Sequence, residues 1–195
     1  MPRHPAHTSP RVAAPGRRAA LRSALAAGTA ALLVPFAPGR ATAAAPAAGP
    51  LPAPTGRVIL TVSGAISARN APDGTARFDR AMLEELGTAS FSTRTPWHEG
   101  VPTFEGVPMA ALMRAVGASG ETVVATALND YSTDIPASDF ERHGVLLALK
   151  RDGEYMPVRD KGPLFVVYPF DSDPALRTRT YHARSAWQVA RLHVR

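Results

Sequence analysis

The pattern of apolar and polar residues predicts a domain of short strands and short helices between residue 57 and the C-terminus. Short segments in which apolar, β-branched and aromatic residues alternate with polar ones or run together are typical of strands. They predict seven strands, at 57–64, 89–95, 122–128, 145–151, 154–158, 164–170 and 187–194. Asp152 and Gly153 predict a tight hairpin turn between the fourth and fifth of these strands.

Helical spacing is confined to three short segments. Asp79 is typical of an N-cap, and Met82, Leu83 and Leu86 share one face of the helix that follows, which is expected to end at Gly87. Two further helical segments are expected at 109–116 and 137–142. Because strands outnumber helices and most connections are short, the predicted class is α+β with a mixed, largely antiparallel sheet.

The N-terminal region has a different composition. Arg17 and Arg18 precede an uncharged apolar run at 24–36, and small residues at 41–43 form a cleavage site, so 1–43 is expected to be an export signal. The paired arginines resemble a twin-arginine signal, with an ordinary secretory signal as the alternative. We therefore expect a periplasmic or extracellular protein. The apolar run is too short to span a bilayer comfortably, so no stable membrane insertion is expected.

Composition and charge indicate how the chain is organised and which classes of partner they do not support. Segment 44–56 is rich in Pro and Ala and is expected to be a disordered linker before a single domain at 57–195. The net charge of +6 belongs entirely to segment 1–43, which holds six arginines and no Asp or Glu. The remainder is neutral, which gives no support to nucleic-acid binding. The chain has no cysteine, so its core must hold the fold without disulfides.

The residues that could take part in binding or catalysis lie in the predicted loops. Trp97 offers either a flat stacking surface for a planar ligand or a plug for one end of the core. The carboxylate of Asp130, between Asn129 and Tyr131, could accept hydrogen bonds from the N–H groups of a pterin ring. An Asx turn is the alternative interpretation of the same three residues.

Three further positions are less specific. Arg159 is one of two cations in a turn that suits an anion or the carbonyl side of a heterocycle, although a solvated surface turn is the alternative. Tyr168 lies at the end of an apolar strand, where its hydroxyl needs a partner. Trp187 is assigned to the core. The histidines are scattered without metal-ligand spacing, so no metal site is expected.

Four segments carry a resemblance to a known family: TRTPW, ALNDYSTDIP, RDKGPLFVVYPF and RSAWQ, in this order. Together they resemble the sulfite-oxidase-like molybdopterin-binding domain, which implies the fold expected above and a pterin-type cofactor. In that family a cysteine four residues before the tryptophan of the first segment ligates molybdenum. Here that position is Thr93, whose hydroxyl is a poor substitute for a thiolate.

The resemblance also implies a binding site. The family's Lys/Arg-Ser-x-x-Trp stretch helps to hold the cofactor's phosphate, and Arg184 and Ser185 match its residue types. With the loop residues, this predicts a pterin pocket formed by Thr95, Trp97, Asn129, Asp130, Tyr131, Arg159, Tyr168, Arg184 and Ser185. No catalytic residue is predicted.

Two functions from different classes follow. The cysteine-free chain resembles periplasmic pterin-binding proteins that regulate the periplasmic domains of membrane-bound cyclic-di-GMP enzymes, which implies a non-metallated pterin, a membrane signalling partner and no enzymatic activity of its own. The alternative is a molybdenum-cofactor-dependent oxidoreductase with a non-cysteine metal site and bound molybdopterin. A structural domain whose loops bind nothing is a third possibility.

Overall fold

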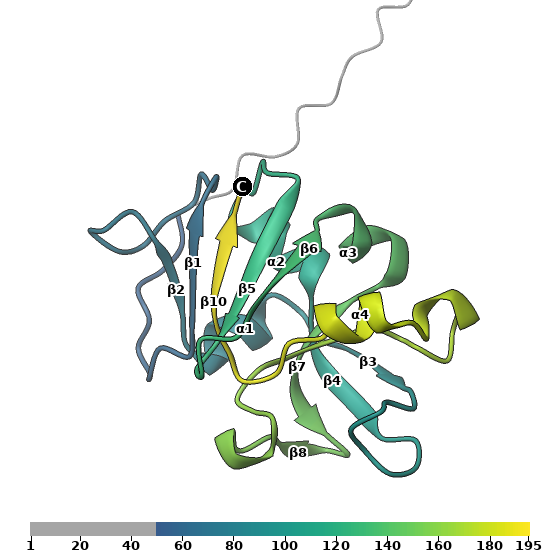
Figure 1. Ribbon diagram of the computed structural model, residues 1–195. Coiled ribbons are helices and arrows are strands. Elements are labelled where there is room, and N and C mark those ends of the chain that lie inside the picture. Colours follow the sequence, from purple (N-terminus) through teal and green to yellow (C-terminus); the bar gives the residue numbers. More distant parts are fainter. Residues whose placement is uncertain (1–49) are drawn as a thin grey trace, which may run out of the picture. The chain divides into compact units, whose positions relative to one another are not determined.

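The computed structural model describes residues 50–195, which form two sheets and several short helices (Figure 1). The strands are β1 (Leu60–Gly64), β2 (Ala76–Phe78), β3 (Ala89–Ser92), β4 (Thr103–Pro108), β5 (Thr122–Ala127), β6 (Ser132–Pro136), β7 (Leu146–Arg151), β8 (Glu154–Tyr155), β9 (Phe165–Val167) and β10 (Val189–Val194). The helices are α1 (Arg80–Glu85), α2 (Met109–Ala115), α3 (Ser138–His143) and α4 (Arg179–Arg184), with 3₁₀ turns η1 (Val158–Asp160) and η2 (Pro174–Leu176). The expected export signal at 1–43 lies outside the described residues.

The two sheets confirm the predicted fold class. The first has the order β2-β1-β10-β5-β6, and the second has the order β3-β4-β7-β8, with β9 also paired to β7. Only the β1–β10 pair, with Val62 opposite Leu192, is parallel among these strands, and the other pairs are antiparallel. The fold is therefore α+β with mixed, largely antiparallel sheets.

The core follows from the apolar spacing of the strands and helices. In β5 the buried residues are Val123, Ala125 and Ala127, which alternate with half-buried neighbours as expected for a strand with one face on the core. In α2 the buried residues include Met109 and Leu112, three apart on one helical face. Val123, Ala125, Met109 and Leu112 belong to one hydrophobic cluster, where burying each large side chain contributes about 1.5–3 kcal/mol.

Asp79 fixes both the start of α1 and the segment before β1. Its side chain accepts hydrogen bonds from the backbone N–H of Met82 at 2.9 Å, as predicted for an N-cap, and from Thr55 and Gly56 at 2.9 and 2.7 Å. These backbone donors lower the pKa of Asp79. Leu51 packs against the core. The described part of the expected linker, from residue 50 to 56, is thus bound to the domain rather than disordered.

The sequence pattern missed four elements, β2, β4, β6 and α4. The strand β4 contains Gly106 and Pro108, residue types that normally indicate breaks in strands. In the structure a Cβ at Gly106 would lie 2.2 Å from the carbonyl oxygen of Leu147 on the paired strand, so this close approach requires glycine. All seven expected strands are shorter in the structure. The largest differences are that β1 begins at Leu60, β3 ends at Ser92, β8 ends at Tyr155, β9 covers only Phe165–Val167 and β10 begins at Val189.

The other missed elements lack the signals that periodicity arguments use. The strand β6 lies at the edge of its sheet and has one fully buried residue, so it shows no apolar alternation. The helix α4 has no fully buried residue and no side-chain cap. It lies beside β6 (Figure 1), and this placement brings the end of α4 next to the turn between β5 and β6.

Candidate functional site

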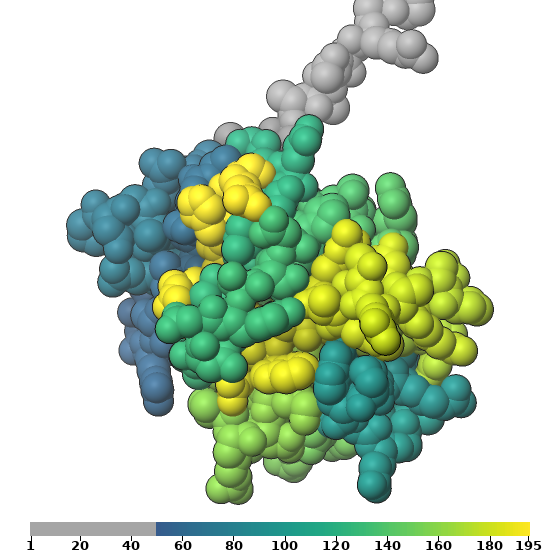
Figure 2. Space-filling model, viewed as in Figure 1, coloured from purple at the N-terminus to yellow at the C-terminus, as the bar shows by residue number. Residues whose placement is uncertain are grey.

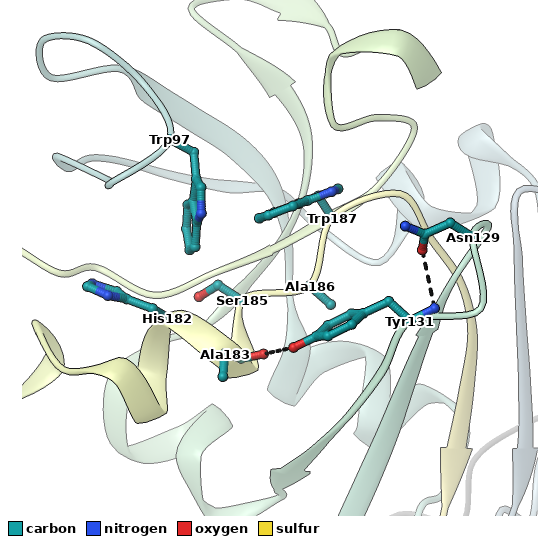
Figure 3. Close-up of a pocket in the computed structure, with 8 residues that line it drawn as sticks. All are labelled: Trp97, Asn129, Tyr131, His182, Ala183, Ser185, Ala186 and Trp187. Carbon is teal, nitrogen blue, oxygen red and sulfur yellow. Dashed lines mark hydrogen bonds between the residues drawn. The ribbon is translucent and has the colours of Figure 1, made fainter.

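A pocket of about 360 Å³ opens where the loop after β3, the β5–β6 turn and the C-terminal end of α4 meet (Figure 2). This volume is within the usual range of small-molecule sites. Four of the lining residues are aromatic or heteroaromatic (Figure 3), and the full lining comprises Trp97, Asn129, Tyr131, His182, Ala183, Ser185, Ala186 and Trp187.

Trp97 is held from several sides while it lines the pocket. Its ring lies edge-on to Trp187, Phe165 and His182, with ring centroids 5.3, 5.8 and 5.8 Å apart. It also packs against both hydrophobic clusters. Trp97 therefore meets both interpretations at once. It packs against the core, and this packing holds in place the part of its ring that lines the pocket.

Trp187 was assigned to the core, and this is only half right. Part of the ring packs against the smaller cluster around Phe165, and the residue forms a bridge with the Phe165 backbone. The ring also lines the pocket (Figure 3). The next residue, Gln188, has a φ of 55°, so the chain turns sharply before β10, and Trp187, which was predicted to begin this strand, lies outside it.

The β5–β6 turn supplies one wall through Asn129 and Tyr131. The Asn129 side-chain oxygen accepts a hydrogen bond from the Tyr131 backbone N–H at 3.2 Å, which is the Asx turn expected as one interpretation. The Tyr131 hydroxyl donates to the backbone carbonyl of Ala183 at 2.9 Å and so ties the turn to α4. Both side chains face the pocket (Figure 3).

Asp130 lies in the same turn but does not line the pocket. Its φ of 61° is left-handed, and its side chain is 86% exposed. The carboxylate accepts a hydrogen bond from the Arg191 guanidinium at 3.0 Å. The structure therefore does not bring this carboxylate to the site where a pterin ring was expected to meet it.

Tyr168 and Arg184, two further predicted site residues, belong to a buried polar cluster that we call the Asp139 cluster. Tyr168 Oη and Arg184 Nη1 each donate to the Asp139 carboxylate at 2.8 Å. Tyr168 is wholly buried and Asp139 is 3% exposed. Burial, and then the bond to Asp139, raise the pKa of Tyr168 well above its ordinary value. The expectation that Tyr168 needs a partner holds, but that partner is internal.

Ser185 is the only residue of the predicted phosphate-binding pair that lines the pocket. Its hydroxyl donates to the Tyr181 carbonyl at 2.9 Å, so its proton is already engaged. Arg184 is bound to Asp139, as described above. Arg159 lies in η1, and it does not line this pocket. A phosphate group would therefore find no free cation among the lining residues.

The two threonines before Trp97 are both buried and engaged. Thr93, at the position where the resembling family has its metal-ligating cysteine, is 0% exposed, and its hydroxyl accepts a hydrogen bond from the Asp171 backbone N–H at 3.0 Å. The Thr95 hydroxyl lies 2.7 Å from Nδ1 of His98. Neither residue lines the pocket, although Thr95 was predicted to do so.

His98 sits behind this loop in an apolar and cationic environment. Burial is the main cause of its lowered pKa, and the charges of Lys161 and Arg151 add to the effect. Within residues 50–195 its Nε2 atom is buried without a hydrogen-bond partner. The imidazole contacts Thr95 behind the Trp97 loop and does not line the pocket.

The sequence did not indicate His182, Ala183 or Ala186, because all three belong to or follow the unpredicted helix α4. The adjacency of α4 to the β5–β6 turn is a tertiary feature, and no local pattern encodes it. A usable signal was the pair of aromatic residues Tyr181 and His182 close before Trp187, since such residues are common in ligand pockets.

Half of the lining residues, His182 among them, carry aromatic or heteroaromatic rings. The lining contains no Asp, Glu, Lys or Arg. The polar groups of the lining residues are the Asn129 amide, the Ser185 and Tyr131 hydroxyls, the His182 imidazole and the ring N–H groups of the two tryptophans. Flat aromatic surfaces with one amide suit a planar, uncharged heterocycle that carries both hydrogen-bond donors and acceptors.

Comparison with known families supports the same class of ligand. Residues 79–171 match the family described as the oxidoreductase molybdopterin binding domain. The match runs from the N-cap of α1 to the segment after β9 and covers slightly less than half of the 195 residues. The matched range includes Trp97, Asn129 and Tyr131, whereas α4 and Trp187 follow it. No curated protein matches the chain.

The residues fit the pterin part of such a cofactor but not its metal. The aromatic lining and the Asn129 amide suit the ring system. Within residues 50–195, no three His, Asp or Glu side chains are grouped as metal ligands would be, and the chain has no cysteine. The Thr93 hydroxyl is already engaged by its hydrogen bond from the Asp171 backbone N–H.

Within residues 50–195, no helix is long and apolar enough to cross a membrane.

Proposed function

We propose that the protein binds a free, non-metallated pterin in the pocket between Trp97 and Tyr131, without catalysing a reaction. The observation that carries the proposal is the lining itself, which offers aromatic surfaces and an amide but neither a thiolate nor a fixed cation. A neutral pterin ring needs the first two, whereas a molybdenum centre with a phosphorylated tail needs the last two.

Asn129 is the group that we expect to recognise the ring. Its oxygen already accepts one hydrogen bond, from the Tyr131 N–H, and retains a second lone pair. Its amide nitrogen donates to no other group within residues 50–195. One donor and one acceptor side by side match the N–H and C=O of the pyrimidinone edge of a pterin. The rings of Trp97 and Trp187 contribute stacking worth about 1 kcal/mol each.

The oxidoreductase alternative requires rearrangements that the pterin proposal does not. A metal at Thr93 would need this buried hydroxyl to leave the Asp171 N–H. A phosphate at Arg184 would need the guanidinium to leave a nearly buried carboxylate, which costs about 3–5 kcal/mol when one partner of such a pair is lost.

The proposal extends to a signalling role. An exported pterin-binding protein can act as a sensor if occupancy of its pocket changes its binding to the periplasmic domain of a membrane-bound cyclic-di-GMP enzyme. The support is the resemblance of the four motifs and the signal-like segment 1–43. Fractionation of cells carrying Arg17→Lys/Arg18→Lys tests the route: a twin-arginine substrate stays in the cytoplasm, and a general secretory substrate is still exported.

The ligand content of the purified protein tests the function. The protein is produced in a molybdenum-replete host, its molybdenum is measured by elemental analysis, and its extract is examined for pterin fluorescence. We expect a fluorescent pterin and molybdenum far below one atom per chain. Stoichiometric molybdenum would establish the alternative. Thr93→Cys is a useful second sample, and we expect it to gain no metal, because the position is closed by Asp171.

A further inference from the structure

A second and larger groove lies on the other side of the β5–β6 turn. It has a volume of about 800 Å³ and runs between the segment that enters β1 and the segment around η1. In the lower left of Figure 2 the blue start of β1, the green turn and the light-green η1 segment approach one another there. We call this the β1–η1 groove.

Exposed apolar side chains gather along the β1–η1 groove. Val58, Leu128 and Val158 are 40%, 53% and 48% exposed, and all three line it. They are half of the six large apolar side chains that are exposed within residues 50–195. Single exposed apolar residues are ordinary on a protein surface, but a cluster in one groove marks an interaction site.

The same groove is flanked by cations that lack acidic partners. Arg57 and Arg80 line it, and Arg159 follows Val158 directly. Within residues 50–195 none of these three arginines forms a salt bridge; Arg80 instead lies over the ring of Tyr155, 4.1 Å from its centroid.

The acidic residues of the groove are engaged elsewhere. Asp79 caps α1 and binds the backbone before β1. Glu84 accepts a hydrogen bond from the Tyr155 hydroxyl at 2.6 Å. Both carboxylates keep their negative charge in these contacts, so Arg57, Arg80 and Arg159 exceed them by one positive charge, although residues 44–195 together are neutral.

We propose that the β1–η1 groove docks a segment of a partner protein in which apolar side chains are flanked by carboxylates. Val58, Leu128 and Val158 supply the apolar anchors. The unpaired arginines select an acidic segment, since complementary charge steers association and disfavours basic partners. The partner's own sequence is thereby constrained: it presents Asp or Glu next to Leu, Ile or Phe.

The groove and the pterin pocket share one turn. Leu128 lines the groove, while Asn129 and Tyr131 line the pocket. Between them, Asp130 binds Arg191, which also lines the groove. Resting on the proposed function, this arrangement predicts that a pterin which fixes the turn changes the affinity of the groove for its partner segment.

The test uses short synthetic peptides on the purified protein. One fluorescent peptide alternates Leu with Glu, and a matched peptide replaces each Glu by Lys. Binding is measured by fluorescence polarisation, with and without free pterin. The variants are Leu128→Asp and Arg57→Glu. The controls are Val101→Asp, since Val101 is 52% exposed but lies outside the groove, and Arg142→Glu.

We expect the acidic peptide to bind, and Leu128→Asp and Arg57→Glu to weaken that binding at least about tenfold, while Val101→Asp and Arg142→Glu change it less than about twofold. Added salt should weaken it, because the contacts are electrostatic. Four results would overturn the proposal: no binding of the acidic peptide, equal binding of the Lys peptide, equal losses in the controls, or self-association in sedimentation that Leu128→Asp abolishes.

A parallel titration of the same variants with pterin separates this proposal from the proposed function. If the protein binds the peptide but no pterin, the proposed function is wrong and the groove proposal stands. If the protein binds pterin but no peptide, the groove proposal is wrong and the proposed function stands. Leu128→Asp should melt within about 2 °C of the parent, because an exposed substitution of this kind changes stability by about 0.5 kcal/mol or less.

Discussion

The Asp139 cluster and the pterin pocket lie against the same helix, α4, and are built from similar residues. In the cluster, Tyr168 and Arg184 turn inward and share one carboxylate that is 3% exposed. In the pocket, Tyr131 is 46% exposed, and the Asn129 amide nitrogen forms no hydrogen bond within residues 50–195. The difference is whether each polar group is satisfied within the protein. Residue type alone does not distinguish a structural polar cluster from a ligand site.

Breaking the Asp139 cluster is expected to have the largest effect on stability. Asp139→Ala leaves Arg184 and Tyr168 without their acceptor in a buried site, which costs about 3 kcal/mol and lowers the melting temperature by roughly 10 °C. Tyr168→Phe removes only one bond and should cost about 1.5 kcal/mol. Thermal denaturation measures both. If a variant melts like the parent but no longer binds pterin, the Asp139 cluster takes part in pterin binding rather than only in stability.

Removing an aromatic wall of the pocket should affect binding more than stability. Trp187→Ala is expected to weaken pterin binding about fivefold, because a stacking surface worth about 1 kcal/mol is lost. The control is Phe91→Ala, since Phe91 packs against the same small cluster but does not line the pocket. If both variants weaken binding equally in a fluorescence titration, the effect comes from the shared packing and not from stacking.

Much of the framework could be predicted from the sequence, because it rests on local signals. The alternation in β5, the cap at Asp79 and the apolar face of α2 are each readable over a few residues. The strand β4 was missed because Gly106, required by the nearby Leu147 carbonyl, reads as a break. The helix α4 was missed because it buries no residue completely.

The site was less predictable for a related reason. Asn129 and Tyr131 were identified by type, and the structure brings them together with Trp97 and Ser185. Nothing local shows that Arg184 has an internal acceptor, because Asp139 is 45 residues away in the sequence. Nothing local shows either that Trp187 lines the pocket in addition to packing against the small cluster around Phe165.

The buried imidazole of His98 predicts a pH dependence that the pocket lining does not. Its pKa is lowered in the folded protein, mainly by burial, so the unfolded chain binds a proton more readily. Stability should therefore fall as the pH drops below about 6.5, the ordinary value for histidine, and continue to fall until the lowered folded pKa is reached. The slope is at most about 1.4 kcal/mol per pH unit.

Urea denaturation between neutral and mildly acidic pH measures this slope, and His98→Gln should reduce it. His193→Gln is the control, since His193 is exposed and bonded only to the exposed Ser63 hydroxyl. An unchanged slope in His98→Gln would assign the pH dependence to another group and leave His98 accessible to protons in the folded state.

The exposed ion pair beside the pocket is expected to contribute least. Asp130→Asn removes the charge that pairs with Arg191 while keeping a residue type that tolerates a left-handed backbone. Because both side chains are more than half exposed, the change in unfolding free energy should be about 0.5 kcal/mol or less. A loss several times larger in chemical denaturation would show that this pair fixes the β5–β6 turn.

A paired titration of free pterin into Asn129→Ser and Asp130→Asn tests the central claim most directly. Ser at position 129 keeps a side-chain oxygen for the turn but lacks the amide. The account predicts that Asn129→Ser binds pterin at least about tenfold more weakly than the parent, while Asp130→Asn stays within about twofold of it. The reverse order, with Asp130 needed and Asn129 dispensable, would contradict the pocket described here and restore the carboxylate as the group that recognises the ring.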